Sequence, residues 1–327
     1  MPLLLLFWGG SVQAMREQID LGYSRLYVLD ATPRDFGAEY IRVYIVDGGE
    51  QAVAVVETGP ASVAESVAKA VAEIANGRQV EIILTHVHID HGGGAGRVAG
   101  LLTEQGLQVA IWAHPRGAPH IVNPSKLWKA SNEALGETAL VYGEPEPAPS
   151  SAVHETRDGM ELCLGQARLR IIHTPGHASH HQSILLEPAV GQGERILFPG
   201  DSAGMYDPSS QGLAPTTPPP LRLDMYRESL RRMIDEKPDR IAFTHIGLGP
   251  AQLLETHRWQ VDIWEETVRE ALARGLDPEK TLEAILDRDP YTARLYQRLG
   301  GTPHGRRMIL NSVLGFMDYV QRMQGSY

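Results

Sequence analysis

Residues 85–93 read THVHIDHGG, which places three histidines and one aspartate within six residues. The segment follows an apolar run typical of a strand and leads into a glycine-rich turn. Side chains at a strand end repeat every second residue, so His86 and His88 point the same way and can grip one metal ion. Once the chain turns, Asp90 and His91 can face a second metal beside the first. Core packing does not account for such a cluster.

Three further ligand-type residues follow apolar, strand-like runs later in the chain. His177 comes after the run that ends in Ile171 and Ile172, Asp201 follows Leu197-Phe198, and His245 follows residues 241–243. Proteins with α/β folds build their sites at the ends of strands, so we expect these side chains to converge on residues 86–91. Imidazole and carboxylate ligands suit Zn²⁺, Fe or Mn better than Ca²⁺.

Short β-branched runs alternate with helical stretches through the first two-thirds of the chain. The clearest helix opens after Pro60, where Ser62 and Glu65 have capping-box spacing, and it closes at Asn76-Gly77. Other helices are expected at about 125–135 and 223–234. The predicted strands are Arg25–Leu29, Ile41–Val46, Ala52–Val56, Val80–Leu84, Val109–Trp112, Ala167–His173, Gln182–Leu186, Arg195–Phe198 and Arg240–Phe243.

The pattern becomes purely helical after about residue 250. Gly275 ends a long amphipathic helix, and Asp277-Pro278 and Asp289-Pro290 are typical of the starts of two more. We therefore expect an α/β catalytic domain at 1–249 and a helical region at 250–327. Residues 115–151 are predicted to be an insertion that serves as a lid, a dimer contact or both.

The composition favours a globular protein and argues against a polyanionic partner. The 327 residues are 43% hydrophobic and 21% charged, and the formal net charge is −10. We expect a small-molecule substrate and no nucleic-acid partner. The protein could be a homodimer, which the composition does not decide. The single cysteine, Cys163, excludes an internal disulfide, favours a cytoplasmic location and is expected to be a buried, inert thiol.

The apolar run at residues 3–8 is too short to span a bilayer and lacks the positive flank of a signal peptide. It is expected to form a first strand or a hydrophobic arm, with Met15 as an alternative start of the protein. No membrane association is expected.

The ligand pattern resembles that of the metallo-β-lactamase superfamily. The resemblance consists of His-x-His-x-Asp-His at 86–91 with His177, Asp201 and His245, and Glu57-Thr58-Gly59 stands where the family usually has Asp-x-Gly. It covers residues 41–247. By this resemblance the fold is a four-layer αβ/βα sandwich carrying a C-terminal helical appendage.

The resemblance also implies a ligand assignment for two divalent metal ions, with zinc favoured and iron or manganese as alternatives. His86, His88 and His177 would bind the first ion; Asp90, His91 and His245 would bind the second; Asp201 would bridge both. Glu57 would orient a metal-binding histidine from behind. Asp90 or Asp201 could shuttle the proton during catalysis.

Several other side chains are candidates near this centre. His180 could line the pocket, and His181 stands where related hydrolases keep a structural histidine. Tyr206, five residues past Asp201, could hydrogen-bond a developing oxyanion, as a tyrosine does in lactonases of the superfamily. His114 is expected to cap a strand near the site. The remaining histidines are expected to be structural or on the surface: His120, His154, His173, His257 and His304.

The leading functional hypothesis is a binuclear hydrolase in which a metal-bridging hydroxide attacks a carboxylic thioester, ester or lactone. The C-terminal helices favour the hydroxyacylglutathione hydrolase-like branch, with Lys126, Lys129 and Arg222 as candidates to grip glutathione by position only. One alternative is a promiscuous phosphodiester or phosphotriester hydrolase, and another is a mononuclear iron sulfur dioxygenase. His88, in place of glutamate, argues against the di-iron flavoprotein oxidases, and a scaffold with a degenerate site is disfavoured by the intact ligand set.

Overall fold

Runs of β-branched and aliphatic residues build two sheets that face each other. The computed structural model describes residues 15–36, 39–49 and 51–324. The first sheet has the order β1-β2-β3-β4-β5-β6-β7, antiparallel from β1 to β4 and parallel from β4 to β7. Its strands are β1 (Met15–Asp20), β2 (Arg25–Asp30), β3 (Arg42–Asp47), β4 (Ala52–Val56), β5 (Gln79–Ile83), β6 (Val109–Ala113) and β7 (Val153–Glu155).

The second sheet has the order β15-β14-β11-β10-β9-β8 and is antiparallel except for the pair β11 and β14. A separate hairpin joins β12 (Met205–Asp207) to β13 (Gly212–Ala214). The strands of the second sheet are β8 (Glu161–Leu164), β9 (Ala167–His173), β10 (Gln182–Pro188), β11 (Ile196–Phe198), β14 (Arg240–Ala242) and β15 (Leu248–Pro250).

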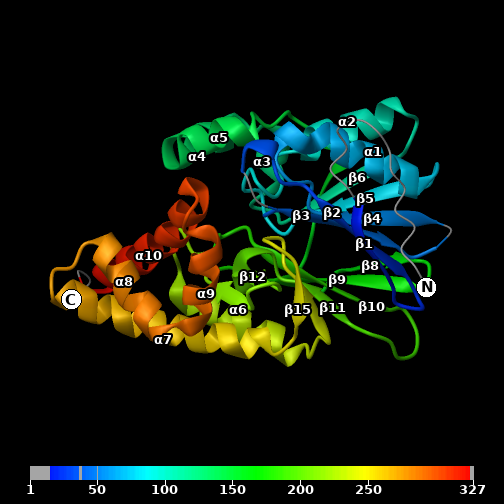
Figure 1. Ribbon diagram of the computed structural model, residues 1–327. Helices are drawn as coiled ribbons and strands as arrows, with labels where there is room; N and C mark the ends of the chain where they lie inside the picture. Colours follow the sequence, from blue (N-terminus) through cyan, green and yellow to red (C-terminus); the bar gives the residue numbers. More distant parts are fainter. Residues whose placement is uncertain (1–14, 37–38, 50, 325–327) are drawn as a thin grey trace.

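Helices cover the outer faces of both sheets (Figure 1). The helices α1 (Ala64–Ala75) and α2 (Ala95–Glu104) lie on the first sheet, and α6 (Leu223–Asp235) lies on the second. Side chains such as Val28, Tyr44 and Ile171 fill the space between the sheets. The architecture is therefore the expected four-layer sandwich of helix, sheet, sheet and helix.

Two groups of helices stand beyond the ends of the sheets (Figure 1). The segment between β6 and β7 forms α3 (Ala118–Val122), α4 (Ser125–Leu135) and α5 (Glu137–Tyr142). The C-terminal group consists of α7 (Leu253–Ala273), α8 (Pro278–Arg288), α9 (Pro290–Leu299) and α10 (Pro303–Gln324), and it has its own core around Trp264 and Phe316. None of the helices in the described part of the chain combines the length and apolarity that crossing a membrane requires.

Some local expectations are confirmed and others are wrong. The carboxylates of Asp277 and Asp289 cap α8 and α9 by accepting hydrogen bonds from backbone N–H groups, as predicted. The capping box at Ser62 and Glu65 is wrong, because a 3-10 turn over Ala61–Val63 precedes α1 and no side chain caps that helix. Cys163 is exposed rather than buried, since β8 is an edge strand. The apolar run at 3–8 lies outside the described residues.

Candidate metal centre

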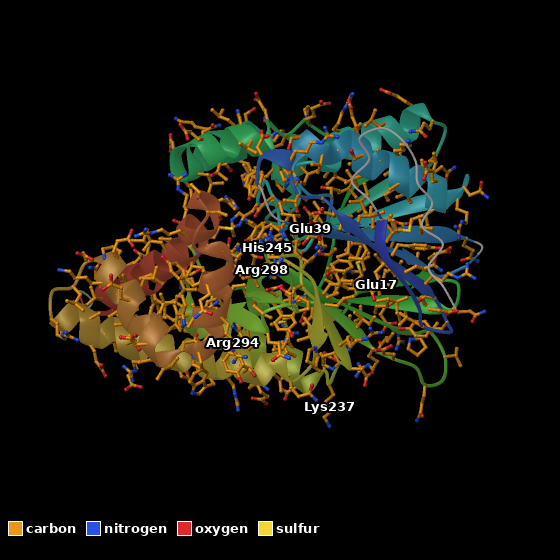
Figure 2. All side chains as sticks on the ribbon, viewed as in Figure 1. Glu17, Glu39, Lys237, His245, Arg294 and Arg298 are labelled. Carbon is orange, nitrogen blue, oxygen red and sulfur yellow. The ribbon has the colours of Figure 1, made fainter. Side chains whose placement is uncertain are left out.

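The predicted ligands all follow the ends of strands at one edge of the sandwich. His86 to His91 come after β5, His177 after β9, Asp201 after β11 and His245 after β14. Glu57 follows β4 directly and has a positive φ of 67°. Figure 2 shows His245 between the sheets and the C-terminal helices. The seven side chains named from the sequence therefore meet in one place, although they span residues 86–245.

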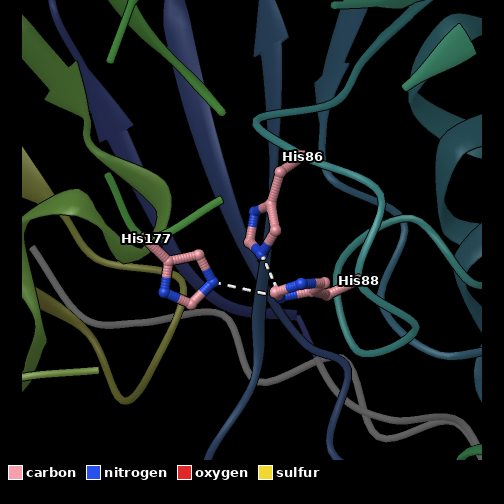
Figure 3. A group of neighbouring side chains, drawn as sticks. All are labelled: His86, His88 and His177. Atoms are coloured by element: carbon pink, nitrogen blue, oxygen red, sulfur yellow. Dashed lines mark hydrogen bonds between the residues drawn. The ribbon is translucent and has the colours of Figure 1, made fainter. Parts of the chain in front are cut away.

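His86, His88 and His177 form a first group whose ring nitrogens converge (Figure 3). The Nδ1 atom of His88 lies 3.0 Å from Nε2 of His86 and 3.0 Å from Nε2 of His177. A tetrahedral zinc ion bound at about 2.0–2.1 Å from each nitrogen would hold them about 3.3 Å apart. The three rings are thus close to the arrangement that one metal ion needs.

Asp90, His91 and His245 form a second group beside the first. The Nε2 atoms of His91 and His245 are 3.2 Å apart. The Oδ2 atom of Asp90 lies 3.6 Å from His245 Nε2 and 3.8 Å from His91 Nε2. This second set of nitrogen and oxygen donors also suits a transition metal or zinc.

Asp201 lies between the two groups and presents one oxygen to each. Its Oδ2 atom is 3.4 Å from His177 Nε2, in the first group. Its Oδ1 atom is 3.3 Å from both His91 Nε2 and His245 Nε2, in the second group. One carboxylate therefore has the placement that the sequence resemblance assigned to a bridging ligand.

Polar groups behind the rings fix which nitrogen faces the centre. The Nδ1–H of His177 donates to the backbone oxygen of Thr216 at 2.6 Å, and His91 Nδ1 lies 3.1 Å from Glu57 Oε1. Thr85 donates its hydroxyl proton to Glu57 and lies 3.1 Å from His86 Nδ1. These contacts leave the Nε2 lone pairs free to bind a metal, and they place Glu57 behind the ligands, as expected.

The pKa values of the side chains at the centre also suit the binding of a cation. Burial, reinforced by the neighbouring imidazoles, lowers the pKa of His86 and His88 well below the usual value, so both stay neutral, as ligands must be. Burial opposes ionisation of Asp201, but the adjacent histidines hold its pKa well below its usual range. Burial likewise opposes protonation of His91, yet the nearby carboxylates, Asp201 foremost, raise its pKa well above normal.

One buried ligand atom that faces the centre is left without a hydrogen-bond partner in the described structure. It is Oδ1 of Asp201. Oδ1 of Asp201 is close to two imidazole nitrogens but lacks the angles of a hydrogen bond to either. Atoms arranged around a shared point, rather than aimed at one another, are what a metal ion satisfies. The residues present therefore fit divalent metals.

His180 and His181 are adjacent in sequence but differ in their surroundings. The ring of His181 is fully engaged: Nε2 accepts a hydrogen bond from the Asp201 backbone N–H at 3.1 Å, and Nδ1 contacts Thr174 and Ser202. His180 lines the cavity in front of the ligands, and its Nδ1 has no partner in the described structure. Burial and nearby histidines lower the pKa of His180 to about 4.

Tyr206 lies away from the position expected for an oxyanion donor. It is 7% exposed, and its ring packs against Phe243, with Leu253 in the same hydrophobic cluster. It is not among the described residues that line the cavity at the ligands. The strand β12 turns this side chain toward the second sheet. Likewise His114 packs on His173 outside the cavity lining.

Other residues reach the cavity that sequence reasoning did not place there. Tyr142 of α5 and His304 of α10 line it, and so does His120, although both histidines were expected to be structural or on the surface. The ring of Tyr40 stacks on His245 at 4.4 Å between centroids and meets His304 at 5.3 Å. Nothing in the local sequence pattern distinguishes these residues, because they come from separate elements.

The cavity itself measures about 670 Å³ and opens onto the ligand cluster. At its inner end lie His88, Asp90, His177, Asp201 and His245. Its sides come from α4, α5, α10 and the proline-rich segment before α6. Lys126 lines it, but Lys129 and Arg222, also considered as glutathione contacts, are absent from the described lining. A pocket of this size accommodates a small organic substrate.

Comparison with known proteins shows which family has this arrangement of ligands. A family model described as the metallo-beta-lactamase superfamily matches residues 37–245. The chain belongs to this superfamily. A curated relative, the metallo-beta-lactamase fold-containing protein ST1585 of Sulfurisphaera tokodaii, is 33% identical over 74% of this chain and 85% of its own length.

Solved structures of other superfamily members share the fold. That of ST1585 has a TM-score of 0.59 at 31% identity and covers 72% of this chain and 85% of its own. The family protein TTHA1429 from Thermus thermophilus has a TM-score of 0.62 at 20% identity, over 91% of this chain and 94% of its own.

One curated relative has an activity in its name, although the match is partial. The atrochrysone carboxyl ACP thioesterase of Aspergillus fumigatus is 26% identical over 46% of this chain and 33% of its own length.

Proposed function

We propose that this superfamily member is a binuclear metal-dependent hydrolase that cleaves a carboxylic thioester, ester or lactone. The observation that carries the proposal is the placement of Asp201. Its two carboxylate oxygens lie 3.3–3.4 Å from histidine nitrogens of two separate ligand groups. A carboxylate shared in this way is typical of two-metal hydrolytic sites.

In this mechanism the protein side chains transfer a proton and position the substrate, whereas the bound metals would activate water. When bound, two zinc ions would supply an activated water and polarise the carbonyl of the substrate. Asp90 borders the cavity, so the carboxylate oxygen that does not face His91 and His245 can take up a proton and deliver it to the leaving group. His180 borders the same space and positions the substrate.

Tyr142 is the phenol that we place at the negative charge developing on the substrate's carbonyl oxygen. It is 2% exposed, comes from α5 and lines the cavity beside Asp90 and Asp201. Burial, together with those two carboxylates, raises the pKa of Tyr142 well above 10, so its hydroxyl keeps its proton and can donate it in a hydrogen bond. This is the role that the sequence suggested for Tyr206.

The character of the cavity supports a carboxylic substrate over a phosphoester. Its sides are largely aliphatic, and the basic groups at its lining are Lys126 and Arg307 with histidines. A phosphodiester would require charge-assisted contacts along its backbone. The name of the partial thioesterase relative points the same way. The single cysteine, without an internal disulfide partner, supports a cytoplasmic location.

The proposal is tested by measuring metal content and activity together. Purified protein loaded with zinc should contain two ions per chain and hydrolyse a thioester or a lactone at least ten-fold faster than an aryl phosphodiester. Asp201→Asn should lose most of the bound metal and turnover while its far-ultraviolet circular dichroism stays native. The matched control is Asp224→Asn, since Asp224 is exposed on α6.

Two outcomes would contradict this function. One iron per chain with oxygen consumption would indicate the dioxygenase alternative. Preferential cleavage of the phosphodiester by the zinc-loaded protein would instead assign the chain to phosphoester hydrolysis.

A further inference from the structure

The helix α4 presents an apolar stripe that is exposed at its middle. Leu127, Ala130, Ala134 and Leu135 recur at the spacing of one helix face; Leu127 and Leu135 are half-buried against the core, whereas Ala130 and Ala134 are exposed. All four line the cavity in front of the ligand cluster. An amphipathic helix normally buries its apolar face, so the exposed middle of this face at Ala130 and Ala134 is available to an apolar group that enters the cavity.

The opposite wall belongs to α10, which has two different faces. Ile309, Val313 and Phe316 pack in the core of the C-terminal helices. Met308 and Leu314 line the cavity instead, with Asn311 beside them. The structure thus places aliphatic side chains on both walls of the cavity, while the proline-rich segment contributes Pro218 and Pro219.

The small side chains of Ala130 and Ala134 keep the space between these walls open. The two helices are joined at one end, where Arg307 of α10 donates to the backbone oxygen of Leu135 of α4 at 2.9 Å. The carboxylates and imidazoles at the cavity's inner end are its most polar part. The sides of the resulting channel combine these apolar side chains with polar ones such as Ser131 and Thr138, and the ligand groups lie at its inner end.

We propose that the substrate is a thioester or ester of an aliphatic acyl chain, and that this chain lies between α4 and α10. The inference rests on the proposed hydrolase function and narrows its substrate class. The acyl carbonyl meets the metal centre, and the hydrocarbon covers the exposed alanines of α4, Ala130 and Ala134. Water adds to the carbonyl carbon, the bond to sulfur or oxygen breaks, and the leaving group takes up the proton.

The test is a series of thioesters with one thiol and acyl chains from acetyl to decanoyl. Burial of each added methylene should raise kcat/KM about four-fold until the cavity is filled. Ala134→Leu, which fills the channel, should lower the ratio of octanoyl to acetyl kcat/KM at least ten-fold. Glu133→Leu adds the same side chain next to it on the solvent face, outside the described cavity lining, and should leave that ratio unchanged.

Binding of free octanoate, measured by calorimetry, gives a readout that does not depend on turnover. Wild-type protein and Glu133→Leu should bind it, and Ala134→Leu should bind it at least ten-fold more weakly. Equal kcat/KM for all chain lengths would overturn the acyl-chain inference and leave the hydrolase intact. Absence of any hydrolysis by metal-loaded protein would reject the hydrolase function, and octanoate binding insensitive to Ala134→Leu would reject the channel.

Discussion

At the scale of single residues, Glu57 shows how the site depends on groups that do not face the metals. It is fully buried and contacts His91 directly and His86 through the hydroxyl of Thr85. A carboxylate in this position orients the imidazoles and increases their basicity. The backbone at Glu57 has a positive φ of 67° and so departs from the conformation of a regular strand.

We expect Glu57→Gln to weaken metal binding by about 10- to 100-fold, because the amide cannot accept both hydrogen bonds as strongly. Competition with a chromophoric chelator measures the affinity, and activity should return at saturating metal. Glu65→Gln is the control, since the Glu65 side chain is 80% exposed. Unchanged affinity in Glu57→Gln would show that Glu57 has no orienting role.

Tyr142 and Tyr206 allow a direct comparison of two candidate phenols. We expect Tyr142→Phe to lower kcat about 100-fold with little change in KM, because a donor that acts on developing charge contributes mainly in the transition state. Tyr206→Phe should have near-normal kcat, since its ring packs in a hydrophobic cluster. Steady-state kinetics on one thioester decides between them, and the reverse result would restore the sequence hypothesis.

His257 makes the stability of the fold depend on pH in a way that does not involve the metal ligands. It is fully buried between Tyr226 and Gln260, and burial lowers its pKa to about 4. The unfolded chain therefore binds this proton more readily, so stability from His257 is present above pH 6.5 and is lost as pH falls toward 4.

We expect this loss to reach about 3 kcal/mol between pH 7 and pH 4. Denaturant unfolding across this range should show a steeper decline for the wild type than for His257→Gln. Parallel declines in the two proteins would mean that His257 is protonated in the folded state.

At the scale of elements, the sequence predicts some strands and helices closely and misses others, among them the long α10. The β-branched and aliphatic runs predict β4 and β9 to the residue, and Asp-Pro pairs predict the starts of α8 and α9. β12, β13 and β15 span three residues each and leave no measurable pattern. Their pairing depends on contacts with distant segments, such as the bridge between Tyr206 and Ile246, which local sequence does not encode.

The contact between α4, α5 and α10 is of the same long-range kind. Arg307 of α10 donates to Leu135 at the end of α4 and lies 3.5 Å from the hydroxyl of Thr138. We expect Arg307→Ala to raise KM several-fold and to change the unfolding free energy by less than about 1 kcal/mol, because the contact is exposed. Hydrogen exchange of α4 should quicken. Arg306→Ala, which removes an exposed pair with Glu279, is the control.

At the scale of the whole molecule, the seven residues that the sequence named converge in the structure, and that they bind metal stays a prediction. Their convergence could be predicted because each follows a strand, and strand ends meet at one edge. The cavity was not foreseen in detail, since its walls come from an insertion and a C-terminal helix whose meeting point no local pattern specifies. The domain boundary near residue 250 stays a prediction, although buried hydrogen bonds such as Gln260 to the backbone of Leu213 cross it.

Removal of the metal ions should lower the stability of the entire fold. The ligands are mostly buried, and without a cation one oxygen of the Asp201 carboxylate stays unsatisfied while the ring nitrogens of His91 and His245 lie only 3.2 Å apart. We expect chelation to lower the melting temperature by at least about 5 °C and zinc to restore it. Differential scanning calorimetry with and without chelator checks this, and equal melting temperatures would indicate that the centre binds metal only weakly.

A chain of buried hydrogen bonds connects the C-terminal helices to the backbone of Asp201. The hydroxyl of Tyr226 lies 3.2 Å from the Asp201 carbonyl and 2.7 Å from His257, whose ring reaches Gln260 and, beyond it, Asp289. An engineer seeking a new specificity would therefore leave residues 253–299 untouched. Residues 125–142 and the cavity-facing positions of α10 could be exchanged instead. Such changes would alter the shape of the cavity entrance and leave the strands that position the metal ligands unchanged.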